Sequence, residues 1–289
     1  MEKALIINAD GFGFTPGVNR GIKESVLQGV VTSTSCVVNF PFIEEIQELS
    51  KLSRLSVGIH FNLSVGKPVA PPEKVSTLLN SRGEFWRELL NKQLVLGRIK
   101  KEHIVAELEF QVEKLLGLGV RPTHWDGHQN KHLHPLFFVS AAQVAKKYGI
   151  TRLRSHKRYL VFEGNGFRRG CRLASYYVTH PHRFLIHTVS RLLTHIGECY
   201  GFKTADRLIS FGYLSDQCLS DRQTWCAILN GLPPGTNEFY CHPAYPDDML
   251  RKYALYVDER LQEKDILISG DIRKLIRKNN IKLISFKDL

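Results

Sequence analysis

The stretch LIINADGFGFTPGVNRGIKESVL, at positions 5 to 27, contains the pattern that decides the fold. Residues 5–8 form a short apolar run of the kind found in buried strands, and the run ends at Ala9-Asp10-Gly11. Pro16 then opens a stretch with apolar residues at helical spacing, and proline is well tolerated in the first turn of a helix. A strand that leads directly into a helix is the repeating unit of an α/β fold.

The same alternation continues to the end of the chain. It predicts strands over residues 31–39, 55–63, 123–126, 151–154, 238–241 and 281–286, and helices over 43–49, 101–116, 135–147 and 184–195. Pro and Gly interrupt residues 64–100, which predicts a long loop or a small insertion there. Because strand and helix alternate without a long series of either kind, we predict an α/β fold of parallel strands, closer to a barrel than to a small open sheet.

Ionisable and imidazole side chains gather where these strands end. Asp10, His60, Asp126, His128 and His242 all fall at or just after a predicted strand end. In a barrel of parallel strands, the carboxyl ends meet at one rim, and chemistry takes place there. Packing alone does not explain why so many separate segments bring Asp or His to this rim. We therefore expect the five side chains to surround one site.

The densest part of this pattern is the run from His124 to His134. It holds four of the twelve histidines, at positions 124, 128, 132 and 134. Neutral imidazole is the commonest metal ligand, and it titrates near neutral pH. A buried structural cluster is the alternative, but a core does not need the charged Asp126 and Lys131. Two histidines and a carboxylate, with open positions for water, would suit a hydrolase.

Composition narrows the classes of partner and reaction. The net charge of +12 fits an anionic partner, and it fits equally well a basic surface without one. The positive charge is densest over residues 152–172. The six cysteines form no Cys-x-x-Cys pair, and the chain has neither a Gly-x-Ser-x-Gly nor a phosphate-loop motif. These absences disfavour zinc-finger, serine hydrolase and nucleotide-dependent chemistry.

Five motifs occur in order along the chain, at residues 8–13, 31–35, 58–63, 122–129 and 241–246. In this combination the sequence resembles the YdjC-like carbohydrate deacetylases, which include chitooligosaccharide and hopanoid-associated deacetylases. The resemblance extends from the first strand to residues 283–286, and only residues 155–235 look different. It implies a distorted (β/α) barrel of the polysaccharide-deacetylase-like type, in a single domain over residues 1–289.

The resemblance also implies a hydrolase that uses a divalent metal, Mg or Zn, to remove acetyl from an N-acetylated sugar. His60 and His128 match the two metal-binding histidines of the family. Asp10 matches the first carboxylate of an Asp-Asp pair and is the expected general base. The second carboxylate is usually a metal ligand, and Gly11 stands in its place here. This departure removes a charged ligand, so we expect weaker metal binding.

The remaining roles are hypotheses built on this resemblance. We expect His242 to protonate the leaving amine and Asp126 to orient His128 or a neighbouring residue. No residue is expected to bind an organic cofactor. We predict four contacts with substrate, which are Arg154, Asn62, Trp125 and Tyr245.

Two alternative functions stay open. Gly11 is compatible with a sugar-binding homologue that has lost much of its catalysis. The basic residues 152–172, followed by the amphipathic segment 184–195, are compatible with an enzyme that acts on a lipid-linked or phosphorylated amino sugar at an anionic membrane surface. The start of the chain lacks the pattern of a secretory signal and no apolar run is long enough to span a bilayer, so we expect a cytoplasmic protein. We also expect a homodimer, and no nucleic-acid partner, because no binding motif is recognised.

Overall fold

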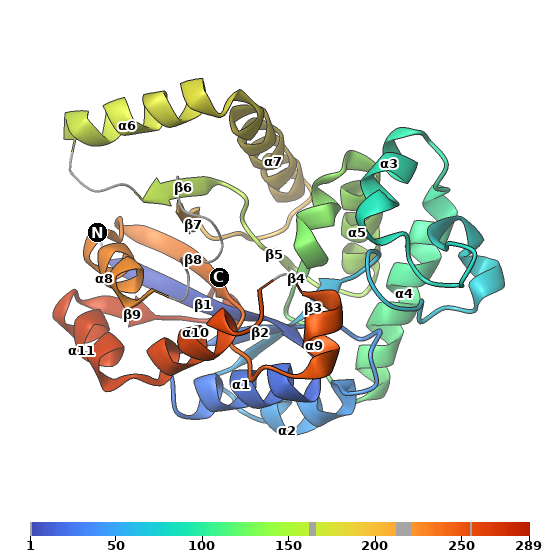
Figure 1. Cartoon of the computed structure of the whole chain (residues 1–289), viewed down its shortest axis with the longest axis horizontal. Helices are drawn as coiled ribbons and strands as arrows, with labels where there is room; N and C mark the ends of the chain where they lie inside the picture. The colour runs from blue at the N-terminus through green and yellow to red at the C-terminus, as the bar shows by residue number, and fades with distance from the viewer. Residues whose placement is uncertain (1, 162–165, 212–220, 255) are drawn as a thin grey trace.

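The strands share one curled, parallel sheet, with helices packed around its outer face (Figure 1). The computed structural model describes residues 2–161, 166–211, 221–254 and 256–289. The strands are β1 (Lys3–Phe12), β2 (Ser33–Cys36), β3 (Ser56–Phe61), β4 (His124–Gly127), β5 (Arg152–Leu153), β6 (Arg158–Val161), β7 (Arg207–Phe211), β8 (Gly235–Cys241) and β9 (Ile281–Leu283). The helices are α1 (Pro16–Leu27), α2 (Ile46–Ser50), α3 (Leu90–Val95), α4 (Lys101–Gly117), α5 (Pro135–Lys147), α6 (Gly166–Thr179), α7 (Pro181–Cys199), α8 (Arg222–Gly231), α9 (Asp248–Tyr253), α10 (Glu259–Ile268) and α11 (Gly270–Lys278).

The order of the strands is that of an incomplete barrel. They follow one another as β5-β4-β3-β2-β1-β8-β7-β6, and β9 pairs with the beginning of β1. Every ladder between the named strands is parallel. The predicted distorted (β/α) barrel is therefore confirmed. All the strands and helices predicted from the alternation are present, but β6, β7 and several helices were not predicted.

Strand β1 divides the molecule into an outer core and a barrel interior. Successive side chains of a strand point to opposite faces. Leu5 and Ile7 belong to the large core shared with the helices, whereas Ile6 packs inside the barrel against Phe286. Farther along the strand, the same inward face carries Asn8 and Asp10. The interior is consequently apolar at the start of β1 and polar at its end.

Two glycines of α1 bring this helix unusually close to the chain that follows β8. A Cβ atom on Gly21 would lie 2.5 Å from the Cα atom of Ala244, and a Cβ atom on Gly17 would collide with the carbonyl oxygen of Tyr245. The backbone N–H of Tyr245 donates to the carbonyl of Gly17 (3.0 Å). Because His242 directly precedes this segment, the contact with α1 fixes where β8 delivers that imidazole.

We predict that Gly21→Ala lowers the free energy of unfolding by roughly 1–3 kcal/mol, because the new methyl group must displace backbone atoms. Alanine forms helices more readily than glycine, so helix propensity alone would make this variant more stable, not less. The control is Gly170→Ala in α6, where a Cβ atom would meet nothing within 4 Å; this variant should be stabilised by roughly 0.5–1 kcal/mol. Urea unfolding of both variants measures the difference, and equal effects would contradict the prediction.

Candidate active site

A single buried guanidinium organises the polar end of the barrel interior. Arg154, just after β5, donates from Nη1 and Nη2 to the two carboxylate oxygens of Asp10 (2.7 and 2.6 Å). Its Nη2 also lies 2.8 Å from Oδ2 of Asp126, and its Nε donates to Oε1 of Glu238 (2.6 Å). Arg154 is only 2% exposed, so these are ion pairs shielded from water. One side chain thus connects three strands, β1, β4 and β8.

The three carboxylates respond differently to this environment. Burial alone would raise the pKa of Asp10 and Asp126, but Arg154 and, to a lesser extent, His60 together outweigh burial and lower both pKa values. Glu238 has one oxygen on the guanidinium, and burial raises its pKa to about 7 despite Arg154. Asp10 and Asp126 are therefore ionised at neutral pH, whereas Glu238 lies close to its midpoint.

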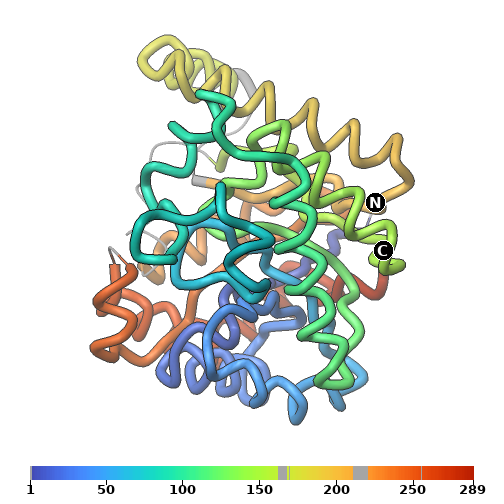
Figure 2. Tube along the Cα trace, turned by 90° about the vertical axis from the view of Figure 1, so that its right-hand side faces the viewer, coloured from blue at the N-terminus to red at the C-terminus, as the bar shows by residue number. Residues whose placement is uncertain are grey.

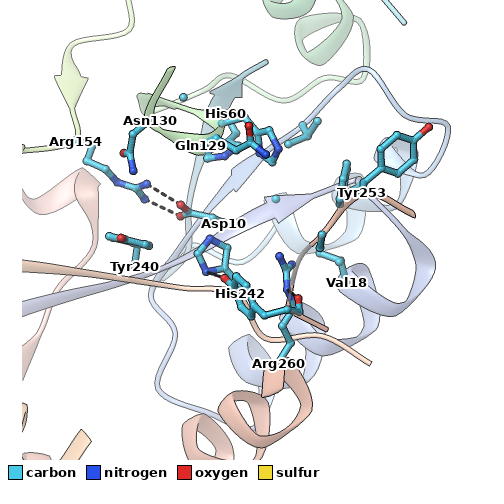
Figure 3. Close-up of a pocket in the computed structure, with 17 residues that line it drawn as sticks. Asp10, Val18, His60, Gln129, Asn130, Arg154, Tyr240, His242, Tyr253 and Arg260 are labelled. Carbon is cyan, nitrogen blue, oxygen red and sulfur yellow. Dashed lines mark hydrogen bonds and ion pairs between the residues drawn. The ribbon is translucent and has the colours of Figure 1, made fainter. Parts of the chain in front are cut away.

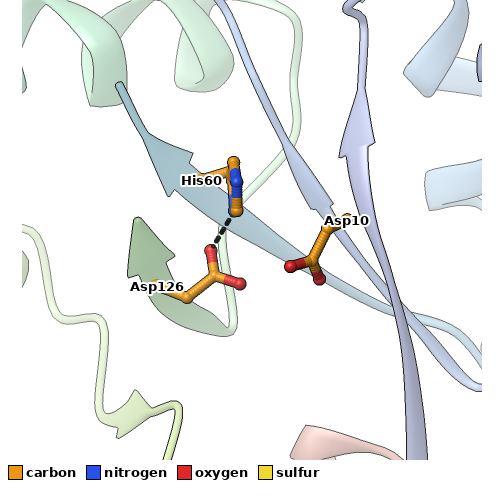
Figure 4. A group of neighbouring side chains, drawn as sticks. All are labelled: Asp10, His60 and Asp126. Carbon is orange, nitrogen blue, oxygen red and sulfur yellow. Dashed lines mark hydrogen bonds and ion pairs between the residues drawn. The ribbon is translucent and has the colours of Figure 1, made fainter. Parts of the chain in front are cut away.

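His60 and Asp126 form a buried pair beside this network (Figure 4). Nδ1 of His60 donates to Oδ1 of Asp126 (2.7 Å), and Ser35 hydrogen bonds to both side chains. Burial would lower the pKa of His60, but Asp126 raises it. Asp126 therefore orients His60, the neighbour of His128 in the site.

His128 stands beside His60, with the centroids of the two rings 5.4 Å apart. Neither of its ring nitrogens has a hydrogen-bond partner among the described residues. Burial, reinforced by the nearby His60, lowers the pKa of His128 well below its ordinary value. The imidazole is consequently neutral, which is the state that binds a metal.

A cavity of about 370 Å³ joins these groups (Figure 3). Asp10, His60, Arg154 and His242 come from separate segments of the chain, and all four line it. His128 lines the cavity as well. Asp126 does not line it but lies directly behind His60, to which it is hydrogen bonded. The five Asp and His side chains predicted at the strand ends therefore lie together.

His242 approaches the cavity from the side opposite to His60 in this view (Figure 3). Its Nδ1 lies 2.6 Å from the hydroxyl of Tyr256. Burial lowers the pKa of His242 to about 3, and the neighbouring Arg260 contributes in the same direction. This imidazole is therefore neutral at pH 7, and it must gain a proton before it can act as a general acid.

Three of the four predicted substrate contacts lie elsewhere. Trp125 is fully buried in the outer core, on the face of β4 opposite to Asp126. The side chain of Asn62 is consumed in a loop, where it donates to the carbonyl of Val65 (2.8 Å) and accepts from two backbone N–H groups. The hydroxyl of Tyr245 donates to Glu24 on the outside of α1 (2.8 Å). Of the four, only Arg154 lines the cavity, and its hydrogen bonds are with protein carboxylates.

The histidine-rich run does not act as one cluster. His124 lies inside the barrel below the site, stacked on Phe286 with ring centroids 3.7 Å apart. His132 instead meets His156, with 2.8 Å between their Nε2 atoms. Only His128 of the four reaches the cavity. At least His124 and His132 are therefore structural histidines, as the alternative interpretation of the run predicted.

Several residues that line the cavity were not selected from the sequence. Tyr240 lies two residues before His242 on β8, so the period of a strand could have indicated it. Phe14 comes from the turn after β1, and Gln129 and Asn130 follow β4. Tyr253, Tyr256 and Arg260 come from the region of α9 and α10, where no element was predicted.

Gly11 also lines the cavity, in a bulge of β1 where the pairing with β2 slips between Asp10 and Phe12. Its φ is +95°, a conformation that favours glycine. A Cβ atom built on it would meet nothing within 4 Å. The position that matches the missing carboxylate is therefore open toward the site.

Comparisons with known proteins agree with this architecture. The model of the YdjC-like protein family matches residues 4–278. The chain belongs to the YdjC-like family. It is 32% identical to a carbohydrate deacetylase of Thermoanaerobacter pseudethanolicus, with 99% of each chain covered. A carbohydrate deacetylase of Geobacillus stearothermophilus is 33% identical over 100% of this chain and 98% of its own.

A solved structure extends the agreement to three dimensions. It is a putative cellobiose-phosphate cleavage protein from Enterococcus faecalis V583, with a TM-score of 0.74 and 26% sequence identity. The alignment covers 100% of this chain and 99% of that one. The family and the fold predicted for this chain are therefore shown by both sequence and structure.

The paired His132 and His156 predict a loss of stability in acid. Burial lowers the pKa of His132 to about 3, and it lowers that of His156 well below the ordinary value. Both rings take up protons more readily in the unfolded chain, so their contribution is complete above pH 6.5 and is lost as the pH falls toward 3. Each ring should cost about 1.4 kcal/mol for every pH unit below 6.5.

Between pH 6.5 and 5, the free energy of unfolding should fall less steeply with pH in His132→Gln than in the unmodified protein. We expect the slope to decrease by about 1.4 kcal/mol per pH unit, the contribution of one ring. Urea unfolding at several pH values measures it. His195→Gln is the matched control, since the side chain of His195 is 71% exposed, and its slope should equal that of the unmodified protein. An unchanged slope in His132→Gln would show that this pair does not control acid stability.

Proposed function

We propose that this protein is a metal-dependent carbohydrate deacetylase, which hydrolyses the acetamide of an N-acetylated sugar. The observation that carries the proposal is the convergence of Asp10, His60, His128 and His242 on one cavity. The relatives named carbohydrate deacetylases support sugar deacetylation as the reaction. The cavity, of about 370 Å³, is of a size that suits a sugar unit.

The residues of the cavity fit a divalent cation. Asp10, His60 and Asp126 have candidate donor atoms within 4.8 Å of one another, and all three are buried. Three buried carboxylates surround the one guanidinium of Arg154, which leaves an excess of negative charge. We propose His60 and His128 as the principal ligands, with Zn²⁺ or Mg²⁺ as the ion. Such an ion would polarise the amide carbonyl and lower the pKa of a water molecule.

Three side chains of the protein are assigned the proton transfers and the positioning of His60. Asp10 is held ionised by Arg154, and it takes a proton from the attacking water, although its lowered pKa makes it a weaker base than a free aspartate. Asp126 fixes the ring of His60 through Nδ1, which directs Nε2 away from this carboxylate. Neutral His242 faces the same cavity and passes to the leaving amine the proton that Asp10 has taken from the attacking water.

Aromatic side chains also line the cavity. Tyr253 packs between Phe14 and Phe40, with ring centroids 5.7 and 5.5 Å away, and Tyr240 lies over the guanidinium of Arg154 at 5.1 Å. Flat rings of this kind bind the apolar faces of sugars, and the tyrosine hydroxyls can meet sugar hydroxyls. We propose Tyr240 and Tyr253 as substrate contacts, in the place of Trp125 and Tyr245.

The decisive test is release of acetate from N-acetylglucosamine and its short β-1,4-linked oligomers, with and without a chelator. The proposal expects acetate and free amine in equal amounts, and loss of both when the metal is removed. Restoring activity with Zn²⁺ or Mg²⁺ would identify the ion. A protein that binds these sugars in calorimetry but releases no acetate with any divalent metal would instead be a sugar-binding homologue.

Asp10→Asn and His242→Asn should each lower kcat by roughly 10²–10⁴-fold, because each removes a group that transfers a proton. The change in KM should be much smaller, since neither side chain is needed to recognise the sugar. Steady-state kinetics on the substrate identified by the screen measure both constants. Asp265→Asn is the control, since this carboxylate pairs with Lys264 and is 60% exposed. A kcat within twofold of the unmodified enzyme would remove the residue concerned from the mechanism.

Gly11→Asp should strengthen metal binding, because it places a carboxylate where the cavity is open. The φ of +95° should cost roughly 1–3 kcal/mol of stability in any non-glycine variant. Gly11→Asn is therefore the matched control, since it carries the same backbone strain without the charge. Calorimetric titration with Zn²⁺ and Mg²⁺ compares the two, and equal affinities would mean that position 11 does not reach the ion.

A further inference from the structure

Helices α6 and α7 form an arm that stands at the outer edge of the molecule in two perpendicular views (Figures 1 and 2). They pack on each other through Tyr177, whose ring centroid lies 5.3 Å from that of Phe184 and whose hydroxyl lies 3.0 Å from Nδ1 of His187. The buried residues of α7 all lie in its second half, from Ser190 onward. The first half of α7 therefore faces outward along with the described part of α6.

The outward side of the arm is apolar to an unusual degree. Eleven large apolar side chains are exposed in the described part of the chain, and six of them lie between residues 178 and 200. Phe184, Leu185 and Leu192 are 56%, 64% and 56% exposed, and the seven-residue spacing of the two leucines places them on the same side of α7. Val178, at the end of α6, is 81% exposed.

The same segment carries positive charge without any negative charge. The sequence from 164 to 197 contains five arginines and four histidines, and it has no Asp or Glu. Of the arginines, Arg168, Arg172, Arg183 and Arg191 have exposed side chains. Apolar side chains and arginines thus share one surface that offers nothing to a cationic partner.

We infer that this arm binds the surface of an anionic lipid bilayer, with its apolar side chains among the acyl chains and its arginines at the lipid headgroups. Helices of this kind, apolar on one side and basic beside it, lie in the plane of the membrane interface. Each arginine near an anionic surface adds about 1 kcal/mol. No helix in the described residues is long and apolar enough to cross a membrane.

The charge also argues against a second copy of the chain as the partner. A symmetric dimer through this arm would place the same basic surface against itself, because a two-fold interface pairs each patch with its copy. Facing arginines without acidic partners repel one another, and this repulsion opposes the apolar attraction. An anionic bilayer satisfies both features at once. This inference rests on the arm alone and is independent of the proposed catalytic function.

The test is co-sedimentation of the full chain with vesicles of phosphatidylcholine, with and without phosphatidylglycerol. We expect binding to the mixed vesicles, weaker binding as salt is added, and little binding to phosphatidylcholine alone. Absence of binding to the mixed vesicles at low ionic strength overturns the inference. Formation of a dimer in light scattering, lost on changing the arm and without any vesicle binding, assigns the surface to a second copy instead.

Two double variants separate the arm from diffuse charge attraction. Arg183→Glu with Arg191→Glu should weaken vesicle binding at least about 25-fold, since each arginine lost accounts for about fivefold. Phe184→Ser with Leu185→Ser keeps the net charge and should weaken it at least about tenfold. The control pair is Leu89→Ser with Leu96→Ser, two leucines of the α3 region that are each 50% exposed. If the control pair weakens binding as much as the Phe184 and Leu185 pair, or if the latter binds normally, the arm is not the membrane-binding surface.

Discussion

The ion pairs of Arg154 are the interaction on which the rest of the site depends. Asp10, Asp126 and Glu238 lie on β1, β4 and β8, and β2 and β3 separate β1 from β4 in the sheet. The guanidinium reaches all three because its donors are spread in a rigid plane, which the single ammonium of a lysine cannot reproduce. Removing one partner from a buried set of this kind costs about 3–5 kcal/mol, so the shape of the site and the stability of the barrel are linked.

The charges around the cavity also give its three histidines different protonation behaviour. The negative excess raises the pKa of His60, whereas His128 and His242 stay neutral because burial and neighbouring positive charge lower theirs. Three imidazoles of the same chemical type therefore enter one cavity with different properties. Such a separation by environment is how a site assigns acid, base and ligand roles to similar side chains.

The sequence was most informative where strand geometry decides the outcome. The period of a strand and the rule for barrel rims placed Asp10, His60 and His242 correctly at one cavity. The same period puts Trp125 on the face opposite to Asp126, so its burial in the outer core followed from the pattern. Tyr253 and Arg260 could not be found in this way, because they reach the cavity only through the packing of the α9 and α10 region. Helix α6 was not predicted, and none of its described side chains is buried, so no contact with the core marks this helix in the sequence.

The open position at Gly11 changes how the remaining carboxylates must work. Without a carboxylate there, the acidic oxygens near His60 belong to Asp10 and Asp126, and both side chains are bound to Arg154. A cation bound at the proposed site would therefore compete with the guanidinium for the same oxygens, and tighter metal binding would loosen the ion pairs that hold the strands in place. An acidic side chain at position 11 could bind the cation and leave Asp10 and Asp126 to their ion pairs with Arg154. In the proposed enzyme, glycine at this one position would thus couple metal affinity to the rigidity of the barrel interior.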